Sequence, residues 1–291
     1  MYTTDTQKIY NRLVADAETV NTLGHEVFAV FLQGSQNYQL DYEGSDIDTK
    51  ALILPAFSDL VRNNKPVSFT HVLPSDEHID IKDMRAMFDV WRKQNIQFLE
   101  VLFTPYAYLN PKYADLAMNL IENREFIAHV NPNVLMNCIE GVMKQKQHAL
   151  KHPYPACADE IEAFGYSAKQ LHHIVRLKDF MIRYAEGEDF ETALIANNRE
   201  ELIHIKSTHD YTADEATQIA DAYVQWAEKF NKAWQAEHPQ DMSVINQNYN
   251  LLDKLLYDTL DAACCRYYQE EWGISQQHES VELEDTFDDC L

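Results

Sequence analysis

Two aspartates, Asp46 and Asp48, stand in the segment 31–53, FLQGSQNYQLDYEGSDIDTKALI, where a strand is expected. Successive side chains of a strand alternate between its faces, so both carboxylates point the same way and the intervening isoleucine points into the core. Asp80 stands between two isoleucines in a later strand, and on an adjacent strand it would join the other two acids. Three carboxylates from two strands are the ligands that two Mg²⁺ (or Mn²⁺) ions need to activate a hydroxyl and to stabilise a transferring phosphoryl group.

The acidic pair follows a loop that contains two of the chain's seven glycines, Gly34 and Gly44. Because glycine is scarce in this chain, the loop is expected to need an unusual backbone geometry or a close approach to a ligand. Small residues at the Gly34-Ser35 turn let backbone N–H groups and the Ser35 hydroxyl approach phosphate oxygens. The loop lacks the GK[ST] of a Walker A phosphate loop and the glycine and glutamate positions of an EF-hand.

A mixture of strands and helices must position these residues. The pattern predicts a first amphipathic helix that ends near Gly24, a helix from Asp83 to Trp91, and strands at 27–33, 47–55, 67–73, 77–83 and 98–103. Beyond about residue 111 it predicts helices at 133–150, 159–186, 199–206, 211–236 and 247–268. We therefore expect an α+β fold, with a mixed β-sheet and flanking helices in residues 1–110, an α-helical domain in residues 111–270, and an acidic, flexible tail in residues 271–291.

The charge of the chain restricts its partners. With 24 basic and 47 acidic residues, the formal net charge is −23 at pH 7, which disfavours binding of extended duplex DNA. A nucleoside triphosphate (NTP) that arrives with a divalent metal is compatible with this charge, because carboxylates hold the metal and the metal neutralises the phosphates. The chain has no apolar run long enough to span a membrane, no signal peptide, and five cysteines without a CxxC pair. These features predict a soluble, cytoplasmic protein with no membrane partner.

Basic residues form a stripe on the predicted helix 159–186. Lys169, His172 or His173, and Arg176 follow one another at helical spacing and so share one side of the helix. A solvated helix face with one core histidine is the alternative interpretation. In the glycine loop, Tyr38 and Tyr42 could stack on a base, although two tyrosines among sixteen are a weak signal.

Two further patterns leave alternatives open. Glu100, in the apolar run 98–103, fits either a buried partner of the site or an acid of an edge strand. Arg199 and His204 match the spacing of a ribonuclease motif of HEPN-type helical domains, but they also fit an ordinary helix start.

Taken together, the motifs resemble the DNA polymerase β-like nucleotidyltransferase superfamily. Its signature is a strand, a Gly-Ser turn, a spacer, Asp-x-Asp on the next strand and a later third acid. Gly34-Ser35, Asp46-Ile47-Asp48 and Asp80 match these parts in order. The resemblance implies a nucleotidyltransferase-type mixed sheet followed by helices.

Within that superfamily, the segment GSQNYQLDYEGSDID is similar to a subgroup that includes the RNA-repair-associated RlaP-type proteins. Segments 95–105, 165–180 and 198–206 are similar to later blocks of the same subgroup. The chain departs from the subgroup at Gln39, where glycine is usual, and at Thr49-Lys50-Ala51, where a small or apolar stretch is usual.

The resemblance implies a metal-dependent enzyme that transfers a nucleoside monophosphate (NMP) from an NTP to an acceptor hydroxyl and releases pyrophosphate. Asp46 and Asp48 would bind both metal ions, and Asp80 would bind the catalytic one. The remaining nucleotide contacts would come from the turn, Tyr38 and the basic helix, through Gly34, Ser35, Tyr38, Lys169, His172 and Arg176.

An RNA or tRNA end is the acceptor that the RlaP-type resemblance favours. The charge of −23 argues instead for a compact acceptor, such as a protein hydroxyl in an AMPylating transferase or a small molecule. A protein of a different class is the other hypothesis, namely a regulatory module that binds a nucleotide or metal without turnover.

Overall fold

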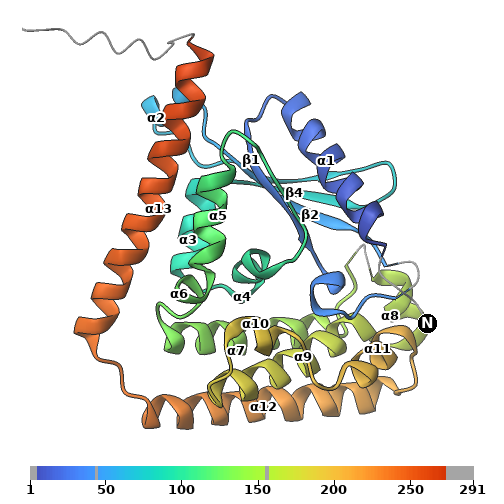
Figure 1. Cartoon of the computed structure of the whole chain (residues 1–291). Helices are drawn as coiled ribbons and strands as arrows, with labels where there is room; N and C mark the ends of the chain where they lie inside the picture. The colour runs from blue at the N-terminus through green and yellow to red at the C-terminus, as the bar shows by residue number, and fades with distance from the viewer. Residues whose placement is uncertain (1–4, 43–44, 155–156, 273–291) are drawn as a thin grey trace, which may run out of the picture.

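A mixed five-stranded sheet forms the first part of the chain (Figure 1). The computed structural model describes residues 5–42, 45–154 and 157–272. The strands are β1 (Val27–Gln33), β2 (Asp48–Ile53), β3 (Ser68–Val72), β4 (His78–Asp83) and β5 (Ala107–Leu109), in the order β3-β4-β2-β1-β5. β2 runs parallel to β4, and all other neighbours are antiparallel. The predicted mixed α+β architecture is therefore confirmed.

Helix α1 (Thr6–Thr22) covers one face of this sheet (Figure 1). The Asp5 side chain caps the helix by accepting a hydrogen bond from the Lys8 backbone N–H at 3.0 Å. Apolar side chains at helical spacing, such as Leu13 and Val20, pack on β-branched residues of the strands, such as Val30. Side chains alternate between the two faces of each strand, and apolar residues occupy both faces. The face opposite α1 must therefore be covered by helices as well.

The opposite face of the sheet is covered by short helices and by the last helix of the chain (Figure 1). These elements are α3 (Met84–Arg92), α4 (Ile96–Leu99), η2 (Glu100–Phe103), α5 (Ala114–Glu122) and α13 (Met242–Glu271). As predicted, Asp83 caps α3, since its carboxylate accepts from the Arg85 N–H at 2.8 Å. The remaining short helix near the sheet is α2 (Phe57–Val61).

A layer of helices follows at one end of the sheet. It consists of α6 (Arg124–Ala128), α7 (Pro132–Ala149), α8 (Ala158–Phe164), α9 (Ala168–Ala185), α10 (Phe190–Leu194), α11 (Arg199–Ser207) and α12 (Ala213–Glu237). Helix α9 is the centre of the layer, because α7, α10, α11 and α12 all pack against it. Helices α7, α11, α12 and α13 lie close to their predicted positions.

The predicted strand at 98–103 is wrong. These residues form α4 and η2, and the fifth strand is β5, which the pattern did not reveal. Asn95 begins the helix, because its side chain accepts a hydrogen bond from the Gln97 N–H at 3.1 Å. A short run of buried apolar residues has no period that distinguishes a strand from a helix, and here the cap decides.

The predicted helix 159–186 is interrupted and forms α8 and α9 instead. Gly165 lies between them with a left-handed φ of 78°. A side chain here would place its Cβ 2.9 Å from the Cβ of Ala213, so glycine is required both by conformation and by space. Helix α8 therefore ends at Phe164, and α9 begins at Ala168.

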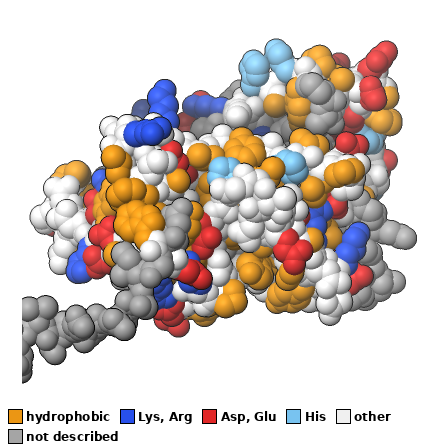
Figure 2. All heavy atoms as spheres, turned by 90° about the horizontal axis from the view of Figure 1, so that it is seen from above, with side chains coloured by type: hydrophobic (Ala, Val, Ile, Leu, Met, Phe, Trp, Pro, Cys, Tyr) orange, Lys and Arg blue, Asp and Glu red, His pale blue; other side chains and the backbone are white. Residues whose placement is uncertain are grey.

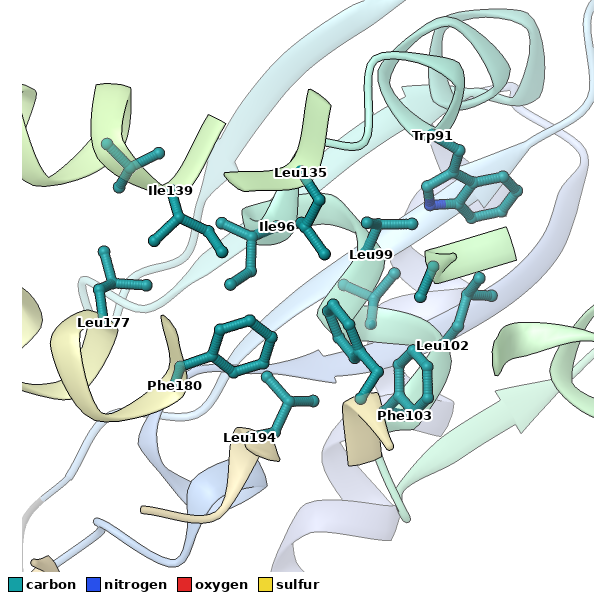
Figure 3. Close-up of a cluster of buried hydrophobic side chains, with 14 of the residues drawn as sticks. Trp91, Ile96, Leu99, Leu102, Phe103, Leu135, Ile139, Leu177, Phe180 and Leu194 are labelled. Carbon is teal, nitrogen blue, oxygen red and sulfur yellow. The ribbon is translucent and has the colours of Figure 1, made fainter. Parts of the chain in front are cut away.

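One hydrophobic core joins the two predicted parts of the chain. Figure 3 shows Trp91 and Leu99 in the same cluster as Leu135 and Phe180 from the helical layer. Helix α13 returns to the sheet, where the Tyr268 hydroxyl donates to the Pro55 carbonyl at 2.7 Å. The structure thus holds the sheet and the helices around one buried cluster.

On the face drawn in Figure 2, basic side chains occur singly or in small groups among acidic, polar and apolar ones. Within residues 5–42, 45–154 and 157–272, no helix combines the length and the apolar character that crossing a membrane requires. Residues 273–291, which make up nearly all of the predicted acidic tail, lie outside the described residues.

Candidate active site

A cavity of about 260 Å³ lies where the end of the sheet meets the helical layer. Its lining comes from the end of β1, the start of β2 and the turn η1 (Ser35–Tyr38), together with η2, α7, α9 and α11. From the first part of the chain it gathers the predicted residues Gly34, Ser35, Tyr38, Asp46 and Asp48. From α9 it gathers Lys169, His172, His173 and Arg176.

The Gly34-Ser35 turn begins at the end of β1. Gly34 has φ 107° and ψ −159°, a conformation that a residue with a Cβ rarely adopts. Two side chains then fix the turn. Gln36 donates to the carbonyl of Asp46 at 2.7 Å, and Asn37 donates to the carbonyl of Leu32 at 2.8 Å. The first bond ties the Gly-Ser turn directly to the acidic segment.

The two acids of the cavity stand at the start of β2. The Asp48 carboxylate accepts a hydrogen bond from the backbone N–H of His78 at 3.0 Å, which anchors it to the start of β4. Between the acids, the Ile47 N–H donates to the Glu77 carboxylate at 3.0 Å, while the Ile47 side chain is buried. Asp46 is exposed, so its carboxylate is available to a ligand.

Behind the acidic segment, a network of charged side chains connects it to α1. Arg12 donates to Asp16 at 2.6 Å and pairs with Glu77, and the Thr49 hydroxyl donates to Asp16 at 2.6 Å. Burial raises the pKa of Asp16, although its hydrogen bonds oppose that shift. The network therefore holds the acidic segment through Glu77, which is bonded to Ile47, and through Thr49, which is bonded to Asp16.

Cations from three helices line the cavity, although the molecule as a whole is acidic. They are Lys146 of α7, Lys169 and Arg176 of α9, and Lys206 of α11. Within the described part of the chain, none of the three lysines has a carboxylate at ion-pair distance. Burial lowers the pKa of Lys146 and of Lys206, and repulsion from Lys169 adds to both shifts. An anion bound among these cations would relieve the repulsion between their like charges.

Arg176 is the most deeply buried of these cations, at 5% exposure. Its guanidinium lies 4.0 Å from the ring centroid of Tyr38, and its Nη2 is 3.7 Å from the carboxylate of Glu100. Its Nε and Nη1 are buried, and no described residue accepts a hydrogen bond from them. Glu100 has a buried oxygen without a donor as well, so the pair leaves both donors and an acceptor for a ligand.

These contacts change the interpretation of two predicted residues. Tyr38 is 4% exposed and supports Arg176 with its ring, rather than presenting an open face to a base. Glu100 is a buried partner of the site, because it lies in η2 beside Arg176 and lines the cavity. In a similar way, Lys206 lies 4.9 Å from the ring centroid of Tyr42.

His172 contributes a neutral side chain to the cavity. Its Nδ1 lies 2.9 Å from the carbonyl of Leu202, which can only accept, so Nδ1 carries the proton. Burial lowers the pKa of His172 to about 4, and it also lowers the pKa of His173. Both imidazoles are therefore uncharged at neutral pH, and the positive charge of the site resides on lysine and arginine.

Asp80 does not line the cavity. In the parallel pair of β2 and β4 it lies opposite Lys50, whereas Asp48 lies beside His78. Its carboxylate pairs with Lys50 and, at 3.4 Å, with Lys82. The strand register thus separates Asp80 from the other acids, and nowhere in the described ranges do three His, Cys, Asp or Glu side chains form a group suited to a metal ion.

Several residues of the cavity were not predicted. Lys146 and Lys206 belong to separate helices, and their convergence follows from the packing of α7 and α11 on α9. Gln33 and Gln97 carry no pattern in the sequence that could have identified them. Gly44, predicted to shape the same loop, lies outside the described residues.

The carboxylates present fit one hard divalent cation. Mg²⁺ is usually bound by one or two carboxylates, with water and substrate phosphates as its other ligands. Asp46 and Asp48 line the same cavity as the four cations, so a metal ion held by these carboxylates would lie near any phosphate that the cations bind. A second ion would need a third carboxylate. Asp80 is already bonded to two lysines, and Glu100, the third acid of the lining, lies 3.7 Å from Nη2 of Arg176.

No family model and no curated protein matches this chain. Among solved structures, it is similar to the crystal structure of a nucleotidyltransferase-like protein from Exiguobacterium sibiricum 255-15. The TM-score is 0.32 and the sequence identity 9%, over 79% of this chain and 77% of that chain. A likeness of this size carries no functional argument, so the function must be argued from the cavity itself.

Proposed function

We propose that the chain is a metal-dependent nucleotidyltransferase, which transfers NMP from an NTP to an acceptor hydroxyl and releases pyrophosphate. The observation that carries the proposal is the composition of one cavity. Asp46 and Asp48 line it together with four cations from α7, α9 and α11. Carboxylates for a metal and cations for phosphates are the two groups that phosphoryl transfer requires side by side.

The cations would bind the phosphates. Two nitrogens of Arg176, Nε and Nη1, have no acceptor among the described residues, and a guanidinium donates paired hydrogen bonds to phosphate oxygens. The lysines add point charges, of which Lys169 is the most exposed. As pyrophosphate leaves, these groups would stabilise the negative charge that develops on it. The Gly34-Ser35 turn would contact the phosphates from the opposite wall through its hydroxyl and backbone.

Asp46 and Asp48 would hold a Mg²⁺ or Mn²⁺ ion. Such an ion neutralises phosphate charge and makes the phosphorus more open to attack. The chain's own contribution is the position of the two carboxylates, which the bonds from Gln36, Ile47 and His78 fix from three sides. The sequence signature shared with the polymerase β-like superfamily supports the same assignment.

An RNA or tRNA end is the acceptor to test first, because the sequence resembles RlaP-type proteins. The charge of −23 favours an acceptor that presents only a short end to the cavity. A protein hydroxyl, as in an AMPylating transferase, is the second acceptor to test.

Asp48→Asn is expected to reduce pyrophosphate release about 1,000-fold, because a neutral amide holds the metal poorly and several kcal/mol of charge stabilisation are lost. The amide oxygen can still accept the hydrogen bond from His78, so the fold is expected to persist. Release is measured from each of the four NTPs, with Mg²⁺ or Mn²⁺, with and without total small RNA. Asp89→Asn, which removes an exposed carboxylate of α3, is the matched control.

Each result has a separate meaning. Release that depends on Asp48 and on added RNA supports both the reaction and the RNA acceptor. Undiminished release by Asp48→Asn would contradict the proposed metal site. NTP binding without release, for every acceptor tried, would favour the regulatory module.

A further inference from the structure

A lysine lies beside Asp80, the residue that was predicted to bind the catalytic metal ion. Lys50 and Asp80 face each other across the parallel strands β2 and β4, and their side chains form an ion pair. Lys82 lies 3.4 Å from the other carboxylate oxygen. Both oxygens of Asp80 therefore face ammonium groups, which leaves the carboxylate neutralised by cations of the chain itself.

Burial of Lys50 makes its ion pair with Asp80 difficult to break. Lys50 is 1% exposed, and its ammonium lies 4.3 Å from the ring centroid of Phe98. Among the residues that the structure describes, Asp80 is the one carboxylate within ion-pair distance of it. If Asp80 turned to a metal ion, it would leave a buried ammonium without its partner, which is strongly unfavourable.

We infer that the cavity binds one divalent cation through Asp46 and Asp48, and that Asp80 is not a metal ligand because Lys50 and Lys82 occupy its carboxylate. This inference rests on the proposed function, since it counts the ions of the same site. The sequence carries a matching signal, because residues 49–51 depart from the small or apolar stretch of the RlaP-type subgroup at Lys50.

Counting bound Mn²⁺ by electron paramagnetic resonance tests the inference without any turnover. The full chain is titrated with Mn²⁺ alone, and the double variant Asp46→Asn/Asp48→Asn is titrated alongside it. The difference between the two corrects for weak binding to the acidic surface. We expect the difference to be one ion per chain.

Two variants at Asp80 complete the test. Asp80→Asn keeps an oxygen for Lys50 and is expected to leave the Mn²⁺ affinity within about twofold of wild type. If that variant fails to fold, Lys50→Met/Asp80→Asn removes both charges together and is expected to give the same count.

The outcomes separate this inference from the proposed function. A difference of two ions, one of which disappears with Asp80, would overturn the inference and leave the transferase proposal intact. A more than tenfold loss of affinity in both Asp80 variants would overturn it too. No Mn²⁺ bound through Asp46 and Asp48 would overturn both proposals.

Discussion

Gln39 adopts a backbone conformation that glycine tolerates better than any other residue. It ends the η1 turn with φ 56° and ψ 35°, in the left-handed region. Its carbonyl accepts two hydrogen bonds from Arg199, at 3.1 and 2.7 Å, which connect the turn to α11. The chain therefore keeps this left-handed turn end with a residue that carries a Cβ.

Gln39→Gly is expected to stabilise the fold. A left-handed residue with a Cβ costs roughly 1–2 kcal/mol, and the greater freedom of glycine in the unfolded chain offsets part of the gain. The Gln39 side chain is exposed and forms no hydrogen bond with a described residue, so about 0.5–1 kcal/mol should remain. Urea unfolding measures the change. Gln218→Gly, on the exposed side of α12, should instead lose about 1 kcal/mol. A lower midpoint for Gln39→Gly would contradict the assigned strain.

Residues that share one element could be predicted as a group from the sequence. Asp46 and Asp48 follow the period of a strand, and Lys169 and Arg176 follow the period of a helix, so spacing alone placed each pair on one side. Asp80 could not be placed in this way, because its neighbour depends on the register between β2 and β4.

The errors in the elements have equally local causes. The run at 98–103 is apolar throughout except for one acid, so neither period is visible, and the Asn95 cap decided for a helix. The helix break at Gly165 was missed, although glycine is the residue that most often follows the end of a helix. The convergence of α7, α9 and α11 on the cavity depends on packing between distant segments, which no local pattern encodes.

The contact between α9 and α11 should give stability a specific pH dependence through His172. Burial lowers its pKa from an ordinary value of 6.5 to about 4. As the pH falls, the unfolded chain therefore binds the proton first. The stability that depends on neutral His172 is present above the unfolded value and is lost as the pH falls toward 4.

His172→Asn is expected to flatten this pH dependence. The Asn amide can still donate to the carbonyl of Leu202, while the titratable group is gone. From about pH 7 to about pH 5.5, wild type should lose about 1 kcal/mol more of its unfolding free energy than the variant does. Urea unfolding at a series of pH values provides the comparison, and parallel curves for the two proteins would contradict the buried, neutral state of His172.

At the scale of the whole molecule, the net charge and the charge of the cavity have opposite signs. The chain carries −23, and on the face shown in Figure 2 the basic side chains are dispersed. Three lysines without an ion-pair partner among the described residues instead meet inside one cavity of about 260 Å³, beside Arg176. A compact polyphosphate needs to meet only the cations of the cavity, whereas a long nucleic acid must also lie against the rest of a molecule whose net charge is −23. Polyphosphate binding should therefore depend on the position of a charged residue rather than on the net charge of the chain.

Two variants with the same change in net charge can separate these effects. Lys169→Gln removes an unpaired cation of the cavity, and it should weaken binding of inorganic tripolyphosphate about tenfold, because a charge-assisted contact contributes about 1.4 kcal/mol. Lys254→Gln removes an exposed lysine of α13 that pairs with Asp258, and it should leave the affinity unchanged. Calorimetric titration at fixed ionic strength, without metal, measures both. Equal weakening in the two variants would mean that the net charge of the protein governs anion binding, and it would contradict a phosphate site in the cavity.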